Sequence, residues 1–312
     1  MRDKQIREAF GEELSKLGYD YDNVVMVSGD LEDSTKAKRF HGQFPDRFFS
    51  VGIAEQDMVG TAVGLALSGY IAFVNSFAVF LTNRAYDAIR MLCCLNKANV
   101  KLCATHAGLT VGLDGASAQC LEDIAIMRAL PNMVVICPCD EYETRKAVRA
   151  AAEYEGPVYL RFSREAFPKV TTPETEYKIG KAVVLKDGND VTIFACGIMV
   201  AKSMNAAKRL EKEGISAAVV NIHTIKPIDR ETILEYGNKT GAAVTAEEHQ
   251  VAGGMGSAVS EVLIQDAVIP IEMVGVEDSF GESGQPEELL EKYGLTEDAL
   301  YNKVKRAISR KK

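Results

Sequence analysis

A glutamate near the start of the chain is the first residue suited to chemistry. Glu55 lies in the segment VGIAEQDM, after a β-rich run and at the start of a helix-forming stretch dense in Gly and Ala. Shielding by the apolar residues Met58–Leu67 would raise the pKa of this carboxyl group, whereas a helix N-terminus would lower it. Glu55 is therefore a candidate for proton chemistry. A carboxylate that only caps or complements the helix N-terminus is the open alternative.

A glycine-rich loop after another β-rich run carries the second set of candidates. It runs from Thr105-His106-Ala107-Gly108 to Gly112-Leu113-Asp114-Gly115. Ligands of open α/β sheets bind beyond the carboxyl ends of the strands. A loop at this place can therefore present His106 and Asp114 to a substrate. An ordinary turn is the alternative.

Further candidates are aromatic or charged side chains near the ends of other predicted strands. Phe77 and Phe80 are three residues apart and share one face if the segment is helical, although core packing explains them as well. Ser34 and Arg164 each follow a predicted strand. The Arg164 guanidinium could bind an anionic group through two hydrogen bonds, or form a surface ion pair instead. The segment 247–256 (EEHQVAGGMG) resembles a phosphate-binding loop, but glycine-rich turns are common before helices.

These candidates need elements that bring the ends of several strands together, and the apolar pattern supplies such elements. Short apolar runs alternate with longer segments of helical periodicity. The predicted strands are Asn23–Val27, Phe48–Val51, Tyr70–Val74, Val100–Thr105, Met133–Ile136, Val158–Arg161, Val191–Ala195, Ala217–Asn221, Ala243–Ala246 and Ile271–Val274. The predicted helices are Ile6–Leu17, Glu55–Leu67, Phe80–Leu95, Leu121–Ala129, Glu141–Glu153, Met199–Glu213, Arg230–Tyr236, Gly256–Gln265 and Glu287–Arg310. This alternation predicts an α/β fold with mostly parallel sheets covered by helices.

One stretch interrupts the alternation and divides the chain. Residues 165–180 (EAFPKVTTPETEYKIG) contain two Pro and three Thr and show no apolar periodicity, which is typical of a linker. We therefore predict two domains, each a mostly parallel sheet flanked by helices, at residues 1–168 and 185–312. The linker between them is predicted at 169–184.

Composition narrows the functional classes. The chain of 312 residues is 47% hydrophobic and 26% charged, as globular proteins are, and carries a net charge of −8. The absence of a basic cluster outside its last three residues argues against binding of a nucleic-acid backbone. Its seven Cys are an odd number and lack the paired spacing of a zinc site. No long apolar run or signal-peptide core occurs, so we expect a cytoplasmic protein without a membrane partner.

Several segments, taken together and in order, are more specific than any one of them. They are GIAEQDM, SFAVF, ATHAGLTVGLDG, LEDIAIMRALPNM, FSR, EEH…GGMGSAVSEVL and FGESGQPEELLEKYGL. In this order they resemble the transketolases, and the resemblance covers nearly the whole chain. It implies a thiamine diphosphate pyrimidine-binding domain followed by a transketolase C-terminal domain. The chain looks like the C-terminal subunit of a split transketolase.

The resemblance implies roles around thiamine diphosphate for three kinds of residue. In this family a glutamate hydrogen-bonds the pyrimidine ring and so promotes loss of the reactive proton of the thiazolium ring, and Glu55 stands at that position. Phe80, with Phe77 beside it, matches the aromatic residue that stacks on the pyrimidine. Relative to some members, one extra residue separates Phe80 from Arg84, which leaves open whether Arg84 or Asn83 lies against the ring. Arg84 is assigned to the cofactor site.

The resemblance also implies substrate contacts. His106 matches a catalytic histidine that faces the substrate near the reacting carbon, where it would assist proton movement or stabilise developing charge. Asp114 matches an aspartate that reads a substrate hydroxyl, and Ser34 and Arg164 match groups that hold the sugar phosphate. Ala118 stands where many members carry His and some Gln. Losing such a hydrogen bond commonly costs about 1–3 kcal/mol.

A motif that the family uses for the charged end of the cofactor is missing. Members bind diphosphate and its metal through Gly-Asp-Gly followed by an Asn, and this sequence contains no Gly-Asp-Gly. The resemblance therefore implies that a separate N-terminal subunit binds the diphosphate and Mg²⁺, and that this chain holds no metal site of its own. The working form would be a heterotetramer containing a homodimer of this chain.

The implied activity is transfer of a two-carbon ketol unit from a ketose phosphate to an aldose phosphate, as in the pentose phosphate pathway. Two enzymatic alternatives are a 1-deoxy-D-xylulose-5-phosphate synthase-like subunit and a pyruvate dehydrogenase beta-like subunit. A non-catalytic relative that keeps only the scaffold is the third alternative, and Ala118 is the residue that keeps it open.

Overall fold

The computed structural model describes residues 4–311, so residues 1–3 and 312, at the outer limits of the two predicted domains, lie outside it. The strands are β1 (Val24–Ser28), β2 (Phe48–Ser50), β3 (Ile71–Phe77), β4 (Val100–Thr105), β5 (Val134–Ile136), β6 (Val158–Arg161), β7 (Val183–Lys186), β8 (Val191–Ala195), β9 (Ala217–Asn221), β10 (Thr224–Lys226), β11 (Ala243–Gln250) and β12 (Ile271–Val276). The α-helices are α1 (Ile6–Asp20), α2 (Lys38–Gln43), α3 (Glu55–Leu67), α4 (Tyr86–Ala88), α5 (Asp123–Arg128), α6 (Glu141–Glu153), α7 (Met199–Glu211), α8 (Arg230–Thr240), α9 (Met255–Asp266), α10 (Pro286–Lys292) and α11 (Glu297–Ser309). Two 3₁₀ helices, η1 (Pro45–Arg47) and η4 (Leu109–Asp114), and two π-helical segments, η2 (Phe80–Arg84) and η3 (Ile89–Cys94), complete the described elements.

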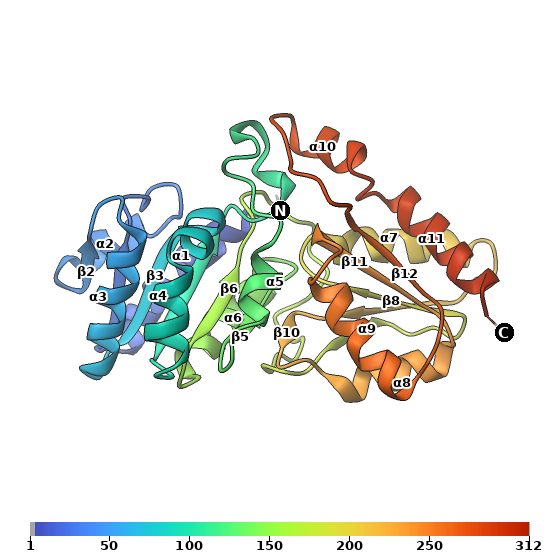
Figure 1. The fold of residues 1–312 in the computed structure, drawn as a ribbon, viewed down its shortest axis with the longest axis horizontal. Helices are drawn as coiled ribbons and strands as arrows, with labels where there is room; N and C mark the ends of the chain where they lie inside the picture. Colours follow the sequence, from blue (N-terminus) through green and yellow to red (C-terminus); the bar gives the residue numbers. More distant parts are fainter. Residues whose placement is uncertain (1–3, 312) are drawn as a thin grey trace.

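The strands form two sheets that lie side by side, each flanked by helices (Figure 1). The first sheet has seven strands in the order β10-β5-β6-β4-β3-β1-β2, and the second has five in the order β12-β11-β8-β9-β7. Among the described strands, only the pairs β10–β5 and β7–β9 are antiparallel. The predicted two-part α/β fold with mostly parallel sheets is confirmed.

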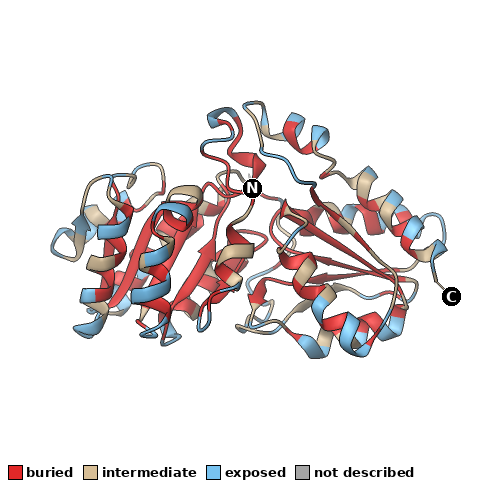
Figure 2. Ribbon diagram, in the orientation of Figure 1, coloured by how far each residue is buried: buried red, intermediate tan, exposed pale blue. Residues whose placement is uncertain are grey.

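The central strands are buried on both faces, which explains their nearly continuous apolar sequences (Figure 2). Helix α1 covers one face of the first sheet with its apolar side, on which Ile6, Phe10, Leu14 and Leu17 are fully buried. Helix α3 packs against β1 and β3 in a second apolar cluster, on the other face of the same sheet. The helices therefore fix where each strand ends, and with it where the loops carrying the candidate residues begin.

Among the described α-helices and strands, three have no counterpart in the sequence prediction: α2, β7 and β10. Strand β10 follows β9 of the second sheet but pairs with β5 of the first, with Thr224 opposite Ile136. Such a pairing depends on contacts far apart in the sequence, and a three-residue strand leaves no periodic signal. The first sheet therefore includes a strand from the later part of the chain.

The predicted helix at Glu287–Arg310 is two helices in the structure. Helix α10 ends at Lys292, and Gly294 has a positive φ of 72°, a conformation that glycine adopts without strain. Thr296 then caps α11, since its side chain accepts a hydrogen bond from the Ala299 N–H at 3.1 Å. The helical tail is confirmed as helical, with a break that the apolar pattern did not reveal.

Candidate functional site

The candidate residues follow the carboxyl ends of neighbouring strands. Strands β6, β4, β3 and β1 are adjacent and parallel in the first sheet, so their carboxyl ends share one edge. Phe77 is the last residue of β3, His106 follows β4, and Arg164 follows β6. This edge of an open α/β sheet is where ligands of such folds bind.

Stacked rings and an ion pair form one continuous wall at this edge. The His106 ring stacks on Phe77 with centroids 3.7 Å apart, and Phe77 stacks on Phe80 at 5.5 Å. The Arg84 guanidinium carbon lies 4.3 Å from the Phe80 ring centroid, and its Nη1 donates to Glu55 Oε1 at 2.8 Å. We call these five residues the stacked wall. It brings together Glu55, both aromatic residues, Arg84 and His106.

The structure shows which of Arg84 and Asn83 lies on Phe80. The Asn83 amide is exposed and donates to Glu122 Oε1 at 3.1 Å, away from the stacked wall. The segment Phe80–Arg84 is π-helical. Its backbone hydrogen bonds span five residues instead of the four of an α-helix, so each hydrogen-bonded turn contains one more residue. A π turn absorbs an additional residue without ending the helix, so Arg84 still lies against the ring.

Glu55 is almost completely buried, with 6% of its surface exposed. It lines a pocket of about 420 Å³, together with Ala54, Gln56, Asp57 and Arg84. Arg84 is half exposed, so its side chain can move to admit a ligand. A shielded carboxylate beside an aromatic face suits a flat heterocycle with a ring nitrogen, and the stacked wall therefore fits the pyrimidine of thiamine diphosphate.

His106 is buried and neutral. Its Nε2 lies 3.4 Å from Arg7 Nη1 and its Nδ1 lies 2.9 Å from Thr105 Oγ1. A guanidinium only donates, so Nε2 accepts and the proton resides on Nδ1. Burial lowers the pKa of His106 to about 3, and the nearby charges of Arg7, Arg164 and Lys36 add to this effect.

Two arginines approach the same place from opposite ends of the first domain's sequence. Arg7 Nη1 donates to the Ser34 carbonyl at 2.9 Å, and burial lowers the pKa of Arg7. Arg164 Nη1 donates to the Val111 carbonyl at 2.9 Å and lies 3.4 Å from Asp114 Oδ1. Arg7 thus links Ser34 to His106, and Arg164, beside Asp114, is close enough for its charge to act on His106. The two guanidinium groups can receive an anionic group.

Arg7 is a site residue that the sequence analysis did not select. It lies in the first turn of α1, where no neighbouring residue suggests chemistry. The pairing of Gln5 with Ala166, together with the Ile6 N–H donating to the Glu165 carbonyl at 3.4 Å, brings this end of the chain next to Arg164. Such a contact spans most of the first sheet's sequence, so no local signal could have revealed it.

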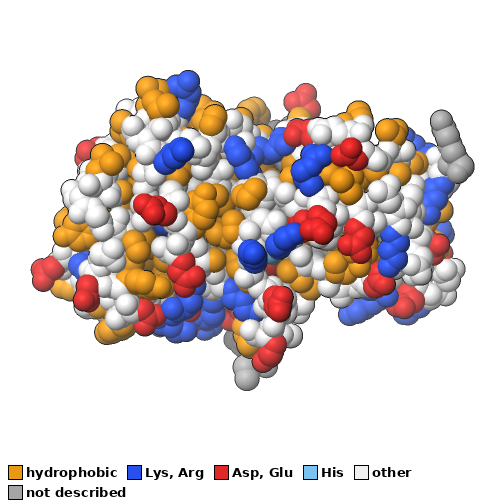
Figure 3. All heavy atoms as spheres, turned by 90° about the horizontal axis from the view of Figure 1, so that it is seen from below, with side chains coloured by type: hydrophobic (Ala, Val, Ile, Leu, Met, Phe, Trp, Pro, Cys, Tyr) orange, Lys and Arg blue, Asp and Glu red, His pale blue; other side chains and the backbone are white. Residues whose placement is uncertain are grey.

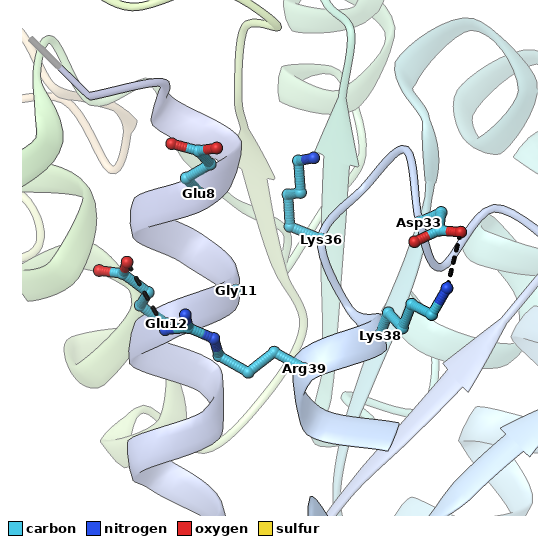
Figure 4. Close-up of a pocket in the computed structure, with 7 residues that line it drawn as sticks. All are labelled: Glu8, Gly11, Glu12, Asp33, Lys36, Lys38 and Arg39. Atoms are coloured by element: carbon cyan, nitrogen blue, oxygen red, sulfur yellow. Dashed lines mark hydrogen bonds and ion pairs between the residues drawn. The ribbon is translucent and has the colours of Figure 1, made fainter. Parts of the chain in front are cut away.

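A second cavity, of about 250 Å³, lies on the other side of the Ser34 segment, between α1 and the start of α2 (Figure 4). Lys38 pairs with Asp33 at 3.0 Å and Arg39 with Glu12 at 3.5 Å, so its lining charges largely satisfy one another. A Cβ at Gly11 would lie 2.4 Å from the Lys36 carbonyl oxygen, which explains a glycine in the middle of α1. This close approach holds Lys36 near the site.

Ala118 and Gln119 follow the glycine-rich loop. Ala118 is buried, and Gln119 turns its amide away from the site. Gln119 Nε2 donates to the carbonyls of Leu109 and Gly112, each at 3.3 Å, and of Glu282 at 2.9 Å. Gln119 therefore braces the loop and does not take the place of the polar side chain missing at Ala118.

Among residues 4–311, no three His, Cys, Asp or Glu side chains are grouped so that they could hold a metal ion. The seven cysteines, all within this range, are buried and free. None of the helices in the same range is long and apolar enough to span a membrane.

Comparison with known proteins places this geometry in a family. The model of the transketolase pyrimidine-binding domain matches residues 2–169, and that of the transketolase C-terminal domain matches residues 180–300. The chain belongs to the transketolase family. A Methanocaldococcus jannaschii protein named for a transketolase C-terminal section is 45% identical over 96% of this chain and 95% of its own length. A 6-deoxy-6-sulfo-D-fructose transketolase subunit of Clostridium sp. is 39% identical over 98% of this chain and 95% of its own.

Among solved structures, this chain matches a split-gene transketolase that is described as an inactive beta4 tetramer. It is 48% identical, with a TM-score of 0.92, and each chain covers 100% of the other. The predicted resemblance to a split transketolase is thereby confirmed at the level of family and fold. The roles of the individual site residues stay predictions.

Proposed function

We propose that this chain is the C-terminal subunit of a transketolase that transfers a two-carbon ketol unit from a ketose phosphate to an aldose phosphate. The observation that carries the proposal is the stacked wall, which ends in a buried carboxylate on one side and in two arginines on the other. A cofactor ring at one end and an anionic sugar at the other would meet at His106.

Thiamine diphosphate, when bound, supplies the carbanion that takes up the ketol unit. The chain's own residues prepare that chemistry. Phe80 offers an aromatic face to the pyrimidine, with Phe77 behind it, and Arg84 moves aside. Glu55 holds a proton at a nitrogen of that ring, and its burial keeps water from competing for the carboxylate.

His106 acts on the sugar as a neutral imidazole. Its low pKa means that it carries no resting charge and accepts a hydrogen bond at Nε2, while burial and the nearby cations oppose full protonation of the ring. Thr105 orients the ring by accepting the Nδ1 hydrogen at 2.9 Å. Asp114 reads a hydroxyl of the substrate, while Ser34, Arg164 and also Arg7 hold its phosphate.

The diphosphate and Mg²⁺ are bound mainly by a separate N-terminal subunit in this proposal. Two observations support such a partner: the missing Gly-Asp-Gly motif and the likeness to a split-gene transketolase described as an inactive beta4 tetramer. Domains at 1–168 and 185–312, with a linker at 169–184, would then form one half of a composite enzyme in the cytoplasm.

Assembly would use an apolar surface of the first domain. Four apolar side chains are exposed there: Leu67 at the end of α3, Met91 and Leu92 on the neighbouring η3 segment, and Leu95 directly after it. We call these four residues the α3–η3 face. Figure 3 shows hydrophobic side chains exposed in patches on the first domain. A homodimer of this chain within a heterotetramer would cover such a face.

Reconstitution tests the proposal. The chain is purified with its N-terminal subunit, thiamine diphosphate and Mg²⁺ and assayed with xylulose 5-phosphate and ribose 5-phosphate. We expect sedoheptulose 7-phosphate from the complex and none from the lone chain. Glu55→Gln should lower kcat by at least about 100-fold, because the proton partner of the ring is lost. Glu153→Gln, which removes an exposed carboxylate at the end of α6, is the matched control.

The same assay separates the alternatives. Product from pyruvate and glyceraldehyde 3-phosphate would indicate a 1-deoxy-D-xylulose-5-phosphate synthase, and acetyl transfer from pyruvate would indicate a pyruvate dehydrogenase beta-like subunit. The Clostridium relative is named for a sulfonated sugar, so 6-deoxy-6-sulfo-D-fructose is included as a donor. A properly assembled complex without turnover on any donor would favour a non-catalytic relative.

A further inference from the structure

The loop of residues 106–115 is held by a buried carboxylate from the second sheet. Glu248, near the end of β11, accepts a hydrogen bond at Oε1 from the Thr110 N–H at 2.6 Å, and both residues are buried. A Cβ at Gly108 would lie 2.3 Å from the Glu248 carboxyl carbon, and the φ of Gly108 is 88°. The loop and the carboxylate therefore fit together only with glycine at position 108.

The anchored residue directly precedes the groups proposed to bind the substrate. Val111, next to Thr110, presents its carbonyl oxygen to Arg164 Nη1 at 2.9 Å. The same Nη1 lies 3.4 Å from Asp114 Oδ1, at the end of η4. A shift of Thr110 would therefore move the carbonyl that orients Arg164, although Glu248 touches neither Arg164 nor Asp114 in the described contacts.

Buried charge keeps Glu248 in place. Arg161 Nη2 donates to the Glu248 backbone carbonyl at 2.9 Å, and Arg161 Nε pairs with Asp123 at 2.8 Å. Burial raises the pKa of the Glu248 carboxyl group, whereas Arg161 and the Thr110 hydrogen bond lower it. A carboxylate that accepts an N–H in a dry environment makes a strong hydrogen bond, and leaving that N–H without a partner is costly.

Residues 282 and 283, in the second part of the chain, also form hydrogen bonds to the loop and to Gln119. Ser283 Oγ donates to the Leu113 carbonyl at 2.7 Å, and Gln119 links the loop to Glu282. Figure 1 shows the loop beside the segment that leads into α10. The loop is thus held along its length by residues of the second part of the chain. Among these contacts, Glu248 contributes a carboxylate.

We propose that Glu248 is a positioning residue that sets the affinity of the site for the anionic end of the substrate. It acts through Thr110 and Val111 on Arg164, and it rests on the proposed function because that function makes Arg164 the phosphate ligand. A weaker anchor loosens Arg164 more than it loosens Glu55, which lies on α3, or His106, whose ring at the start of the loop is also held by its stack on Phe77. The effect should therefore fall on KM for phosphorylated sugars and spare kcat.

A neighbouring residue provides a matched control. Glu247 is equally buried and also accepts backbone hydrogens, from Met255 N at 2.6 Å and Gly256 N at 2.8 Å, but these lie at the start of α9. Glu247→Gln and Glu248→Gln thus remove the same charge from adjacent positions of one strand. Only the second weakens the hold on the 106–115 loop.

The reconstituted complex is assayed with ribose 5-phosphate and with unphosphorylated D-ribose as acceptors. For Glu248→Gln we expect KM for ribose 5-phosphate to rise about tenfold with kcat within about threefold, and kcat/KM for D-ribose to stay within about twofold. Glu247→Gln should leave both acceptors within about twofold. An equal rise for the two variants, or an equal loss on the two acceptors, would overturn the proposal.

Amide hydrogen exchange measured on the chain alone separates this inference from the proposed function. Glu248→Gln should speed exchange of the peptide containing residues 109–114 at least about fivefold, and Glu247→Gln should not. Unchanged exchange in that peptide refutes the anchor whatever the assay shows. Faster exchange with no ketol transfer by the wild-type complex would leave the anchor standing and refute the proposed function instead.

Discussion

At the scale of single residues, His106 shows how position alone sets chemistry. Three cationic side chains, Arg7, Arg164 and Lys36, surround a buried imidazole, and each of them disfavours a second positive charge there. Ser34 and Asp114 complete the same side of the site. A histidine held neutral next to arginines can accept a hydrogen bond from a sugar hydroxyl while the arginines bind the anionic end of that sugar.

The low pKa of His106 predicts a loss of stability in acid. Between pH 6.5 and about 3 the unfolded chain binds a proton at this ring that the folded chain does not, so stability falls as pH falls through this window. At pH 5 the cost is about 2 kcal/mol. Urea unfolding at pH 7.5 and pH 5 should show that His106→Asn loses about this much less stability than wild type.

The control for that measurement is Gln265→Asn, which changes an exposed side chain that carries no titratable group. It should lose as much stability between the two pH values as the wild-type protein. A His106→Asn variant with the same pH dependence as wild type would contradict the assignment of a neutral buried ring.

At the scale of elements, helix α1 matters because it carries Arg7 into the site. It packs against α6, and the buried Glu13, whose side chain is only 4% exposed, links the two helices. Glu13 Oε1 accepts from Arg149 Nε at 2.6 Å, and Arg145 lies 3.7 Å from its other oxygen. These contacts fix α1 in place, although nothing in the local sequence marks Glu13 as a buried residue.

Removing this link should destabilise the fold. Glu13→Ala leaves Arg145 and Arg149 without their shared acceptor and should lower the free energy of unfolding by about 2 kcal/mol. Lys16→Ala removes only a 58% exposed partner of the same carboxylate and should cost no more than about 0.5 kcal/mol. Chemical unfolding of both variants at pH 7.5 checks this. Equal losses would mean that Glu13 contributes nothing beyond a surface ion pair.

The sequence could predict elements whose pattern is local and periodic, such as α3 and the strands β1, β3 and β4. It could not predict β10, because its partner β5 lies far away in the chain and three residues carry no period. The sequence also could not predict the π-helical turn at Phe80–Arg84, since the apolar spacing there fits an ordinary α-helix. At the site, the ends of strands indicated the loop residues, whereas Arg7 and Glu248 act only through long-range contacts.

At the scale of the whole molecule, the two sheets are joined by more than the chain that links them. Strand β10 lies in the first sheet, and Lys226 at its end donates to the Arg128 carbonyl at 2.9 Å. The buried pair of Arg161 and Asp123 lies beside Glu248 at the same junction. The two halves are therefore joined by side-chain contacts beside the site.

The α3–η3 face is the surface that we expect assembly to cover. Leu95 is 67% exposed, and a charge there would have to be buried without a partner in any interface that includes it. Leu95→Glu should therefore shift the lone chain toward the monomer in analytical ultracentrifugation and weaken its binding to the N-terminal subunit at least about tenfold. Ile264→Glu, at a position on α9 that is 70% exposed, should change neither. If Ile264→Glu disrupted assembly and Leu95→Glu did not, the contact surface would have to be moved to the second domain.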